Sequence, residues 1–397
     1  MRQRPWRCWL ARMIRPDQPG PMRRRGPRPL LLHLPSLLPL IGGTRSSSTF
    51  SPVSASLSAG WPSQVPAVPP EGIDAALIRG IAAYRRHPST RTMPDPPVAW
   101  ADGAARLLDY GRAGDLPVLF VPSLVNRAYI LDLMPGQSMM RWLAERGVRP
   151  LLLDWGSPTS RDRDATLTDH VAGTLERAVA WMGEPVVLAG YCMGGMLAVA
   201  AAQRQPDRVR ALALLATPWD FHAGHAASAK RLGAMLPALE PMLQSIGALP
   251  VDILQTLFAS LDPGGIPKKF RAFGAMDQAS DKAARFVALE DWLNDGIPLA
   301  APVARETLGG WYGANTPARG EWRIAAEAVR PDRLRLPCFV AVPGTDRIVP
   351  PDSALALADL IPGAVVHRPA SGHIGMAAGP RAASNLWTPL LDWLRRL

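Results

Sequence analysis

Short, fully apolar runs alternate with amphipathic stretches through much of this 397-residue chain. The apolar runs fall at 117–121, 150–153, 185–188, 211–215, 338–342 and 364–367. Stretches with helical spacing separate or follow them, at 138–145, 166–182, 193–203, 352–360 and 386–395. A strand without polar positions has to be covered on both faces, as parallel strands between two helical layers are. We therefore predict an α/β protein with a mostly parallel sheet that helices cover on both faces.

The alternation stops between Asp220 and Arg335. This long segment has mainly helical spacing and stands between two predicted strands. We therefore expect a helical cap that is inserted between core strands. Its large apolar side chains could form the interior of the cap, the lining of a pocket, or both. They include Met235, Met242, Met276, Trp292, Trp311 and Trp322.

Composition and spacing divide the chain into five segments. Residues 1–68 are predicted to be a disordered tail rich in Arg, Pro and Ser, or the product of an over-extended start. Residues 69–110 are expected to hold one helix and a proline-rich linker. The core would then occupy 111–219, the cap 220–335, and the second part of the core 336–397.

Most of the positive charge lies in the predicted tail. Ten Arg and one Asp in residues 1–45 contribute +9 of the net charge of +11. The remainder is nearly neutral and has no recognisable nucleic-acid reader motif, so we predict no nucleic-acid partner. Arg23–Arg25 followed by the apolar residues 30–41 has the order of an export signal, but two prolines and a histidine interrupt it. No uninterrupted apolar run is long enough for a transmembrane segment, and none is predicted.

The three cysteines give no disulfide framework, which suits a reducing cytoplasm. Cys8 lies in the predicted tail. Cys338 lies within an apolar run, where a small core residue is expected. Cys192 stands instead at the centre of Gly190-Tyr191-Cys192-Met193-Gly194, between a predicted strand and a predicted helix.

A strand, a tight glycine-flanked turn and a helix are the context in which a nucleophile elbow forms. Glycines leave room for the strained turn, and the start of the helix favours the thiolate of Cys192. The backbone N–H of Met193 is one candidate oxyanion donor, and that of Val125, or less favourably Leu124, is the second. Taken alone, the motif could also be a chance turn with a buried thiol.

An elbow predicts an acid after a later strand and a histidine after the last strand. Asp346 and His373 occupy these two positions in that order. We therefore predict an α/β-hydrolase fold with Cys192 as nucleophile, His373 as base and Asp346 as the acid that orients it. Both residues could also be ordinary loop residues. Asp154, at the end of another strand, is the substitute acid, although a structural role is favoured.

Two further histidines, His222 and His225, have the spacing of a metal-binding pair. No third ligand is evident, so a solvated loop is favoured. The sequence therefore predicts neither a metal nor a resident cofactor.

Four stretches resemble the polyhydroxyalkanoate synthase family, in particular its short class III catalytic subunits. They are 117–133, 152–158, the elbow through to Phe221, and 344–350 together with 371–374. The combination of Val-Asn-Arg at 125–127, the Cys elbow and Ser-Gly-His-Ile at 371–374 is fairly specific. The chain departs from the family at Arg347, where a histidine often follows the acid, and in the cap around 308–312. Its segment before the sheet is also much shorter than the N-terminal domain of class I members.

The resemblance implies that Cys192 accepts a 3-hydroxyacyl group from coenzyme A and passes it to the hydroxyl end of a growing polyester. His373 would be the base and Asp346 its supporting acid. It implies acyl-CoA as substrate, a polyester chain or granule surface as partner, a second synthase subunit or a homodimer, and a cytoplasmic location at granules.

Two alternatives remain open at this point. One is a cysteine-dependent hydrolase on the same scaffold, either a thioesterase or an intracellular polyester depolymerase. The other is a non-catalytic granule-associated protein, which predicts that the Cys192, Asp346 and His373 side chains do not converge.

Overall fold

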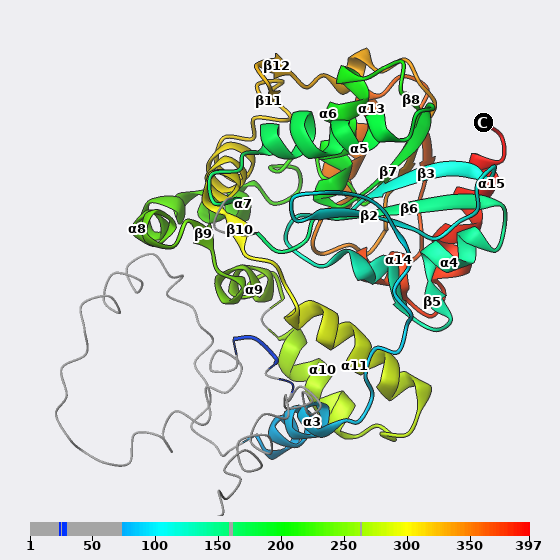
Figure 1. Ribbon diagram of the computed structural model, residues 1–397. Coiled ribbons are helices and arrows are strands. Elements are labelled where there is room, and N and C mark those ends of the chain that lie inside the picture. The colour runs from blue at the N-terminus through cyan, green and yellow to red at the C-terminus, as the bar shows by residue number, and fades with distance from the viewer. Residues whose placement is uncertain (1–23, 25, 30–73, 159–161, 263) are drawn as a thin grey trace, which may run out of the picture.

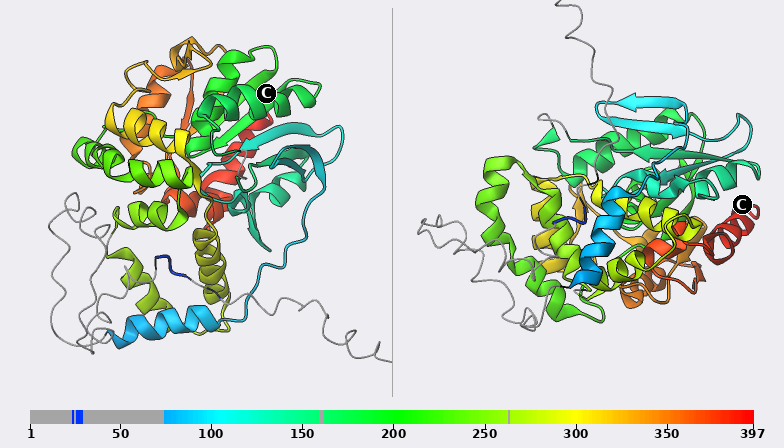
Figure 2. Two further views of the ribbon diagram at one scale, coloured as in Figure 1. Left: turned by 60° about the vertical axis from the view of Figure 1, so that its left-hand side comes forward. Right: turned by 90° about the horizontal axis from the view of Figure 1, so that it is seen from below.

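The computed structural model describes residues 24, 26–29, 74–158, 162–262 and 264–397. Most of the predicted tail, with Cys8, therefore lies outside the described residues. The centre of the molecule is an eight-stranded sheet in the order β1-β2-β6-β3-β7-β8-β13-β14, with helices on both faces (Figures 1 and 2). The predicted fold class, a mostly parallel α/β sheet covered on both faces, is confirmed.

All six predicted strands are present, and each pairs in parallel with its neighbours among these six. Two further strands, β1 and β2, form an antiparallel hairpin that extends the sheet beside β6. The bounds of the sheet strands are β1 (Val98–Asp102), β2 (Ala105–Asp109), β3 (Leu116–Val121), β6 (Val148–Asp154), β7 (Val186–Tyr191), β8 (Val209–Leu215), β13 (Cys338–Ala341) and β14 (Val365–His367).

The hairpin corrects the interpretation of 69–110 as one helix and a linker. β1 has no fully buried residue, and β2 alternates buried Ala105 and Leu107 with exposed Arg106. A half-exposed strand at the edge of a sheet carries few apolar residues, so it lacks the continuous run that marked the inner strands.

Helices cover the sheet in two layers. Figure 1 shows α5, α6 and α13 on one face and α4, α14 and α15 on the other. The bounds of these and the associated short elements are η4 (Ala128–Leu131), β4 (Asp132–Met134), β5 (Gln137–Ser138), α4 (Met139–Ala144), the π-helical η6 (Asp169–Leu175), α5 (Glu176–Trp181), α6 (Met193–Arg204), α13 (Pro351–Leu360), α14 (His373–Ala378), the π-helical η9 (Ala383–Trp387) and α15 (Thr388–Leu394).

The segment between β8 and β13, expected to be a helical cap, is mainly helical. Its elements are α7 (Ala226–Ala234), α8 (Leu236–Ile246), β9 (Ala248–Leu249), α9 (Val251–Ala259), α10 (Gly265–Gly274), α11 (Asp281–Asn294), β10 (Leu299–Ala300), α12 (Ala301–Arg305), the π-helical η7 (Glu306–Gly313), β11 (Arg323–Ile324), β12 (Glu327–Ala328) and η8 (Pro331–Arg333). These elements do not form one layer. β11 and β12 return to α6, where Gln203 donates to the Glu327 carboxylate at 2.6 Å and to the Ala328 carbonyl at 2.9 Å.

The N-terminal helix α3 (Ala75–Arg86) packs on this inserted segment rather than on the sheet. Leu77, Ile81 and Tyr84 of α3 contact Phe270 and Phe273 of α10 in a small separate core. Figure 2 shows α3, α10 and α11 grouped away from the sheet, and we call them the α3–α10–α11 lobe. Two chain segments far apart in the sequence thus build one unit.

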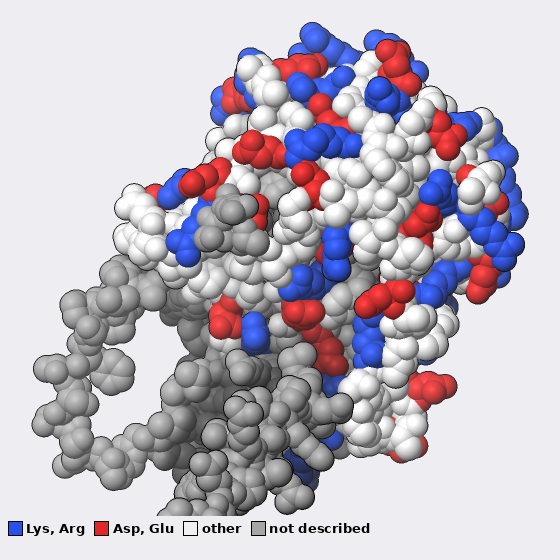
Figure 3. Space-filling model, viewed as in Figure 1, with Lys and Arg blue, Asp and Glu red and all other residues white. Residues whose placement is uncertain are grey.

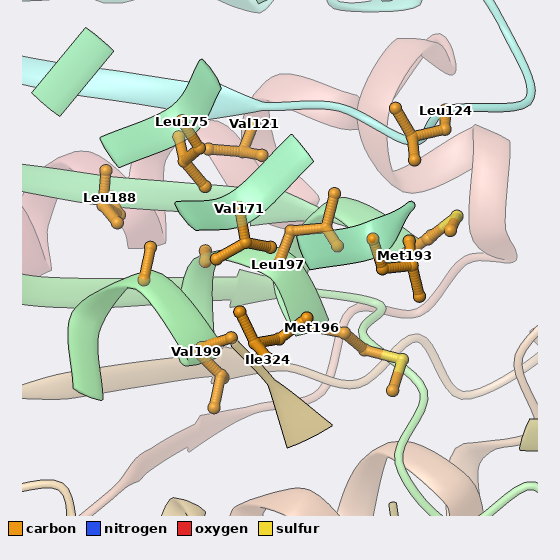
Figure 4. Close-up of a cluster of buried hydrophobic side chains, with 14 of the residues drawn as sticks. Val121, Leu124, Val171, Leu175, Leu188, Met193, Met196, Leu197, Val199 and Ile324 are labelled. Atoms are coloured by element: carbon orange, nitrogen blue, oxygen red, sulfur yellow. The ribbon is translucent and has the colours of Figure 1, made fainter. Parts of the chain in front are cut away.

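The core lies on both faces of the sheet. On one face, Leu188 of β7 and Val121 of β3 lie in the same cluster as Leu197 and Val199 of α6 (Figure 4). Every residue of α6 from Met193 to Ala202 is buried, so this helix has no solvent-facing side along that length. Burial of this kind contributes roughly 1.5–3 kcal/mol for each large side chain. The turn that precedes α6 is therefore continuous with a helix that the core holds in place.

The surface mixes charges of both signs. On the face shown in Figure 3, Lys and Arg side chains are interspersed with Asp and Glu. Among the described residues, no helix combines the length and the apolar character that crossing a membrane requires.

A buried carboxylate joins three parts of the core. Asp132 has no exposed surface, and its oxygens accept hydrogen bonds from Ser138 at 2.6 Å, Tyr110 at 3.1 Å, Arg91 at 3.1 Å and Arg141 at 2.9 Å. Arg91 belongs to the linker after α3, Tyr110 follows β2, and Arg141 lies on α4. Both arginines keep the charge of Asp132 paired, which a buried carboxylate requires.

We expect Asp132→Ala to lower the free energy of unfolding by about 3–5 kcal/mol, because it leaves two arginines without their buried partner. Urea unfolding monitored by circular dichroism measures this loss. The matched control is Glu321→Ala, since the Arg319–Glu321 pair at 2.8 Å is largely exposed and should contribute less than about 1 kcal/mol. Equal effects of the two substitutions would contradict the assignment of Asp132 as a structural centre.

Candidate active site

Cys192 lies in the turn between β7 and α6 with φ 56° and ψ −130°. A positive φ is strained for a residue with a side chain, so the surrounding packing has to hold it. The amide of Cys192 donates to the Leu215 carbonyl of β8 at 2.9 Å, and its carbonyl accepts from the Gly195 amide at 2.9 Å. The predicted elbow is present, and it is tied to the neighbouring strand on one side and to the helix on the other.

Three glycines make this turn sterically possible. A Cβ atom on Gly194 would overlap the carbonyl oxygen of Val121 in β3, and one on Gly190 would overlap the backbone of Gly195. A Cβ atom on Gly195 would overlap the side chain of Thr217. The elbow therefore sits closer to β3 than any residue with a side chain would allow.

Asp346 and His373 meet at the carboxyl end of the sheet. Asp346 follows β13, and its Oδ1 accepts from the amides of Ile348 at 2.8 Å and Val349 at 2.9 Å. Its Oδ2 lies 2.7 Å from Nδ1 of His373, the first residue of α14. Both side chains are buried. Two backbone amides thus fix the carboxylate, and the carboxylate fixes the imidazole ring.

The pKa of His373 reflects its contact with Cys192. Burial alone would lower the pKa of the ring. The charge of the Cys192 thiolate, together with hydrogen bonds to Asp346 and Cys192, outweighs burial and raises the pKa from 6.5 to about 10. The arrangement therefore favours the protonated form of the His373 imidazole. Tyr191 supports the same residue, since its hydroxyl donates to the His373 carbonyl at 3.2 Å.

A cavity of about 350 Å³ opens over Cys192 and His373. Much of its wall is apolar, with side chains from the inserted helices facing the elbow across the cavity. The apolar lining includes Val125, Ile130, Phe258, Leu261, Ile266, Trp292, Leu293, Ile348 and Ile374.

Charged side chains on the same wall are held in ion pairs. Lys269 lies 2.6 Å from Glu290, and Arg347 lies 2.7 Å from Asp262. Arg347 is the residue at which the sequence departs from the family pattern, and its side chain is largely exposed. Glu290 and Asp262 line the cavity as well, so it combines an apolar interior with ion pairs on its wall.

The two predicted oxyanion donors belong to the segments that follow β7 and β3, and of the two only Val125 lines the cavity. Met193 is the first residue of α6, so its amide lacks a helical partner. The amide of Val125 donates to the Ser123 hydroxyl at 3.3 Å, and both residues line the cavity. Leu124, the less favoured candidate, is buried and is not among the residues that line it. Their role as oxyanion donors stays a prediction.

The remaining residues that the sequence singled out, among them Asp154, His222 and Cys338, lie outside the cavity and have other contacts. Asp154 pairs with Arg106 at 2.7 Å, which agrees with the structural role that was favoured for it. Nε2 of His222 lies 2.9 Å from the Tyr312 carbonyl. In the part of the chain that the structure describes, no three His, Cys, Asp or Glu side chains are grouped to hold a metal ion. Cys338 is buried in β13, and burial raises its pKa to about 12, so it is the core residue that was predicted.

Asp346 and His373 meet at 2.7 Å, and Cys192 and His373 line the same cavity, so the assembly of the three residues into a catalytic triad stays a prediction. The Met and Trp residues of the inserted segment divide between the two expected roles. Trp292 lines the cavity, whereas Trp311 and Trp322 pack against each other in the main core.

Sequence reasoning missed a large part of the cavity wall. Gln255 and Phe258 of α9 and Lys269 of α10 carried no motif, because a pocket residue on an amphipathic helix looks like any interface residue. Pro27 and Arg28 also line the cavity, although they belong to the segment that was predicted to be disordered.

Residues 157–380 match the family model described as alpha/beta hydrolase fold. The chain is 31% identical to a poly(3-hydroxyalkanoate) polymerase subunit PhaC of Haloferax mediterranei, over 75% of this chain and 63% of that protein. It is 31% identical to the protein of that name from Synechocystis sp., over 70% of this chain and 77% of the relative. It is 28% identical to the protein of the same name from Allochromatium vinosum, over 71% of this chain and 81% of that relative. The chain thus spans between 63% and 81% of the length of these relatives, and less than two thirds of the Haloferax mediterranei protein.

We expect Gly194→Ala to destabilise the fold by about 1–3 kcal/mol, because the new methyl group would overlap the backbone of β3. Thermal unfolding measures the change. Gly173→Ala in η6 is the matched control, since its Cβ would lie 3.5 Å from the nearest atom, at the end of the Arg177 side chain. The control should be neutral or slightly more stable. A Gly194→Ala protein as stable as the control would disprove the close approach of elbow and strand.

Proposed function

Because this chain belongs to the polyhydroxyalkanoate synthase family of α/β-hydrolase-fold proteins, we propose that it transfers 3-hydroxyacyl groups from coenzyme A to Cys192 and then to a growing polyester. The observation that carries the proposal is the alignment of a strained cysteine, a histidine and a carboxylate at one end of an apolar cavity. The names of the relatives support polymerase activity, and the geometry supports an acyl-cysteine intermediate.

In the first step, Sγ of Cys192 attacks the thioester carbonyl carbon of the acyl-CoA. The carbonyl becomes a tetrahedral oxyanion, for which the amides of Met193 and Val125 are the proposed donors. The bond from carbon to the CoA sulfur then breaks, and the protonated His373 gives its proton to the departing thiolate. The products are free CoA and an acyl group on Cys192. Exchange of one thioester for another is nearly isoenergetic, so the acyl group stays activated.

In the second step, the terminal hydroxyl of the polyester chain attacks the Cys192 thioester. His373, now neutral, accepts the hydroxyl proton, while Asp346 holds the ring through its Nδ1 hydrogen bond. The carbon–sulfur bond breaks, an oxyester forms, and the Cys192 thiolate is restored beside protonated His373. The chain has then grown by one unit. A serine in place of Cys192 would lose the activation of the acyl group at the first step.

The cavity suits the two parts of such a substrate. Its apolar wall, with Phe258 and Trp292, fits an acyl chain. Lys269 and Arg347 are the groups we assign to the phosphates of CoA. We further propose a polyester granule surface in the cytoplasm as the place of action, and a second synthase subunit or a second copy of this chain as partner.

Hydrolysis is the outcome that competes with polymerisation, because water could accept the acyl group from Cys192 instead of a hydroxyl chain end. Purified protein supplied with 3-hydroxybutyryl-CoA distinguishes the two when free CoA, soluble 3-hydroxybutyrate and polymer are all measured. CoA release with polymer is expected. CoA release with soluble acid and no polymer would replace the proposal by a thioesterase.

We expect Cys192→Ala to abolish CoA release and the acyl adduct that intact-protein mass spectrometry detects after one turnover. Cys338→Ala is the matched control, since this buried thiol lies away from the cavity and should leave the adduct in place. The adduct on Cys192 requires no polymer and no second subunit, so it tests the first step by itself. An adduct that persists in Cys192→Ala would refute the assigned nucleophile.

We expect Asp346→Asn to move the alkaline limb of the pH–rate profile to lower pH. The pKa of His373 is raised in part by the charge and hydrogen bond of Asp346, so removing that charge lowers it by about one unit or more. The rate should fall when His373 loses the proton that the departing thiol needs, near pH 10 in the wild type. Profiles of kcat/KM for acyl-CoA in the two proteins measure the shift, and an unmoved limb would contradict it.

A further inference from the structure

The loop that follows β3, residues 122–127, is held at both ends by tryptophan side chains. At its start, Nε1 of Trp155 donates to the Pro122 carbonyl at 3.0 Å. At its end, Nε1 of Trp292 donates to the Arg127 carbonyl at 2.8 Å. Trp155 follows β6 of the sheet, whereas Trp292 lies on α11 of the inserted segment. Two parts of the molecule that are far apart in the sequence thus hold one loop.

The middle of the loop is bound to the chain that follows α11. The amide of Ile297 donates to the Val125 carbonyl at 3.1 Å, and Asn126 pairs with Gly296 in an isolated antiparallel bridge. A peptide carbonyl lies in one plane with the amide of the next residue, so these contacts limit rotation of the backbone after Val125. The Val125 amide itself makes a longer contact, 3.3 Å to the Ser123 hydroxyl. The loop is therefore fixed mainly through its carbonyl groups.

The two indole rings are fixed by different parts of the core. Trp155 is 8% exposed and belongs to the same buried cluster as the α6 side chains, whereas Trp292 is 3% exposed and belongs to the cluster on the opposite face of the sheet. The start of the loop also lies against the elbow, since a Cβ atom on Gly194 would come within 2.6 Å of the Pro122 carbonyl oxygen. Packing on both faces thus sets where the loop lies relative to the elbow.

We propose that Trp292 and Trp155 are positioning residues, which hold the Val125 amide where it meets the oxyanion that forms when Cys192 is acylated. The inference rests on the proposed acyl transfer, in which Val125 is an oxyanion donor. Such a donor stabilises the transition state only when it is fixed in place beforehand, and a misplacement of about 1 Å can cost about 100-fold in rate. The inserted segment therefore has a second role beside lining the cavity, which is to set the geometry of the oxyanion site.

The test is the rate of Cys192 acylation in Trp292→Phe and in Trp155→Phe, since each removes an indole N–H and keeps an aromatic ring. Intact-protein mass spectrometry after rapid quenching measures the rate with two acyl donors, 3-hydroxybutyryl-CoA and p-nitrophenyl acetate, which has no CoA part. We expect the maximal rate with acyl-CoA and the second-order rate constant with the ester to fall about tenfold, less than the roughly 100-fold loss that removal of an oxyanion donor causes. The half-saturating concentration of acyl-CoA should stay nearly the same.

Iodoacetamide separates positioning of the oxyanion donor from a general loss of the site, because it alkylates a thiolate without forming an oxyanion. The rate of Cys192 alkylation should be unchanged in both variants. Trp322→Phe is the matched control, since Trp322 is 2% exposed in the same inserted segment and its Nε1 donates to the Glu306 carboxylate at 2.9 Å instead of to the loop. It should acylate at the wild-type rate. Trp155 does not line the cavity, so lost contact with substrate would not explain its effect.

An unchanged maximal rate in either variant would overturn the proposal for that residue, and a raised half-saturating concentration alone would assign Trp292 to substrate binding. Equal losses of acylation and alkylation would also overturn it, because the thiolate itself would then be affected. A wild-type protein that the ester acylates and acyl-CoA does not would remove the proposed function, while the ester would still decide this inference. A wild-type protein that neither donor acylates would overturn both.

Discussion

The close approach of the elbow to β3 is the contact on which the active site depends. Gly194 brings the first turn of α6 against the Val121 carbonyl, and this contact leaves no room for a methyl group. Since α6 is buried along nearly its whole length, the strained turn cannot relax outward. The same approach sets Met193 beside the loop that carries Val125. One steric constraint thus positions both the proposed nucleophile, Cys192, and the proposed oxyanion donors.

The electrostatic part of the site follows from that placement. With Cys192 fixed, its interaction with His373 raises the pKa of the ring, and Asp346 receives two amide hydrogen bonds that keep it pointing at the ring. Each group stabilises the charged form of the next. A buried histidine would ordinarily be neutral, so the charge on His373 depends on its two neighbours rather than on solvent.

The sequence predicts those parts of the molecule whose local structure requires particular types of residue. The inner strands need unbroken apolar runs and the elbow needs its glycines, so Cys192, Asp346 and His373 could be placed by order alone. The β1–β2 hairpin was missed because half-exposed edge strands need few apolar residues. The wall residues of α9 and α10 were missed because their contacts join residues far apart in the chain. Arg24 shows the same limit: composition marks an arginine-rich segment, but only the fold supplies Asp291 on α11 as its partner.

The separation of the α3–α10–α11 lobe from the sheet has a consequence for how such a protein can diversify. The groups assigned to bond making belong to the sheet and its turns, whereas Phe258, Lys269 and Trp292 come from helices of the inserted segment. Substitutions in those helices can reshape the cavity without disturbing the buried Asp346–His373 pair. Selection can therefore alter which substrates fit while leaving the chemical machinery unchanged.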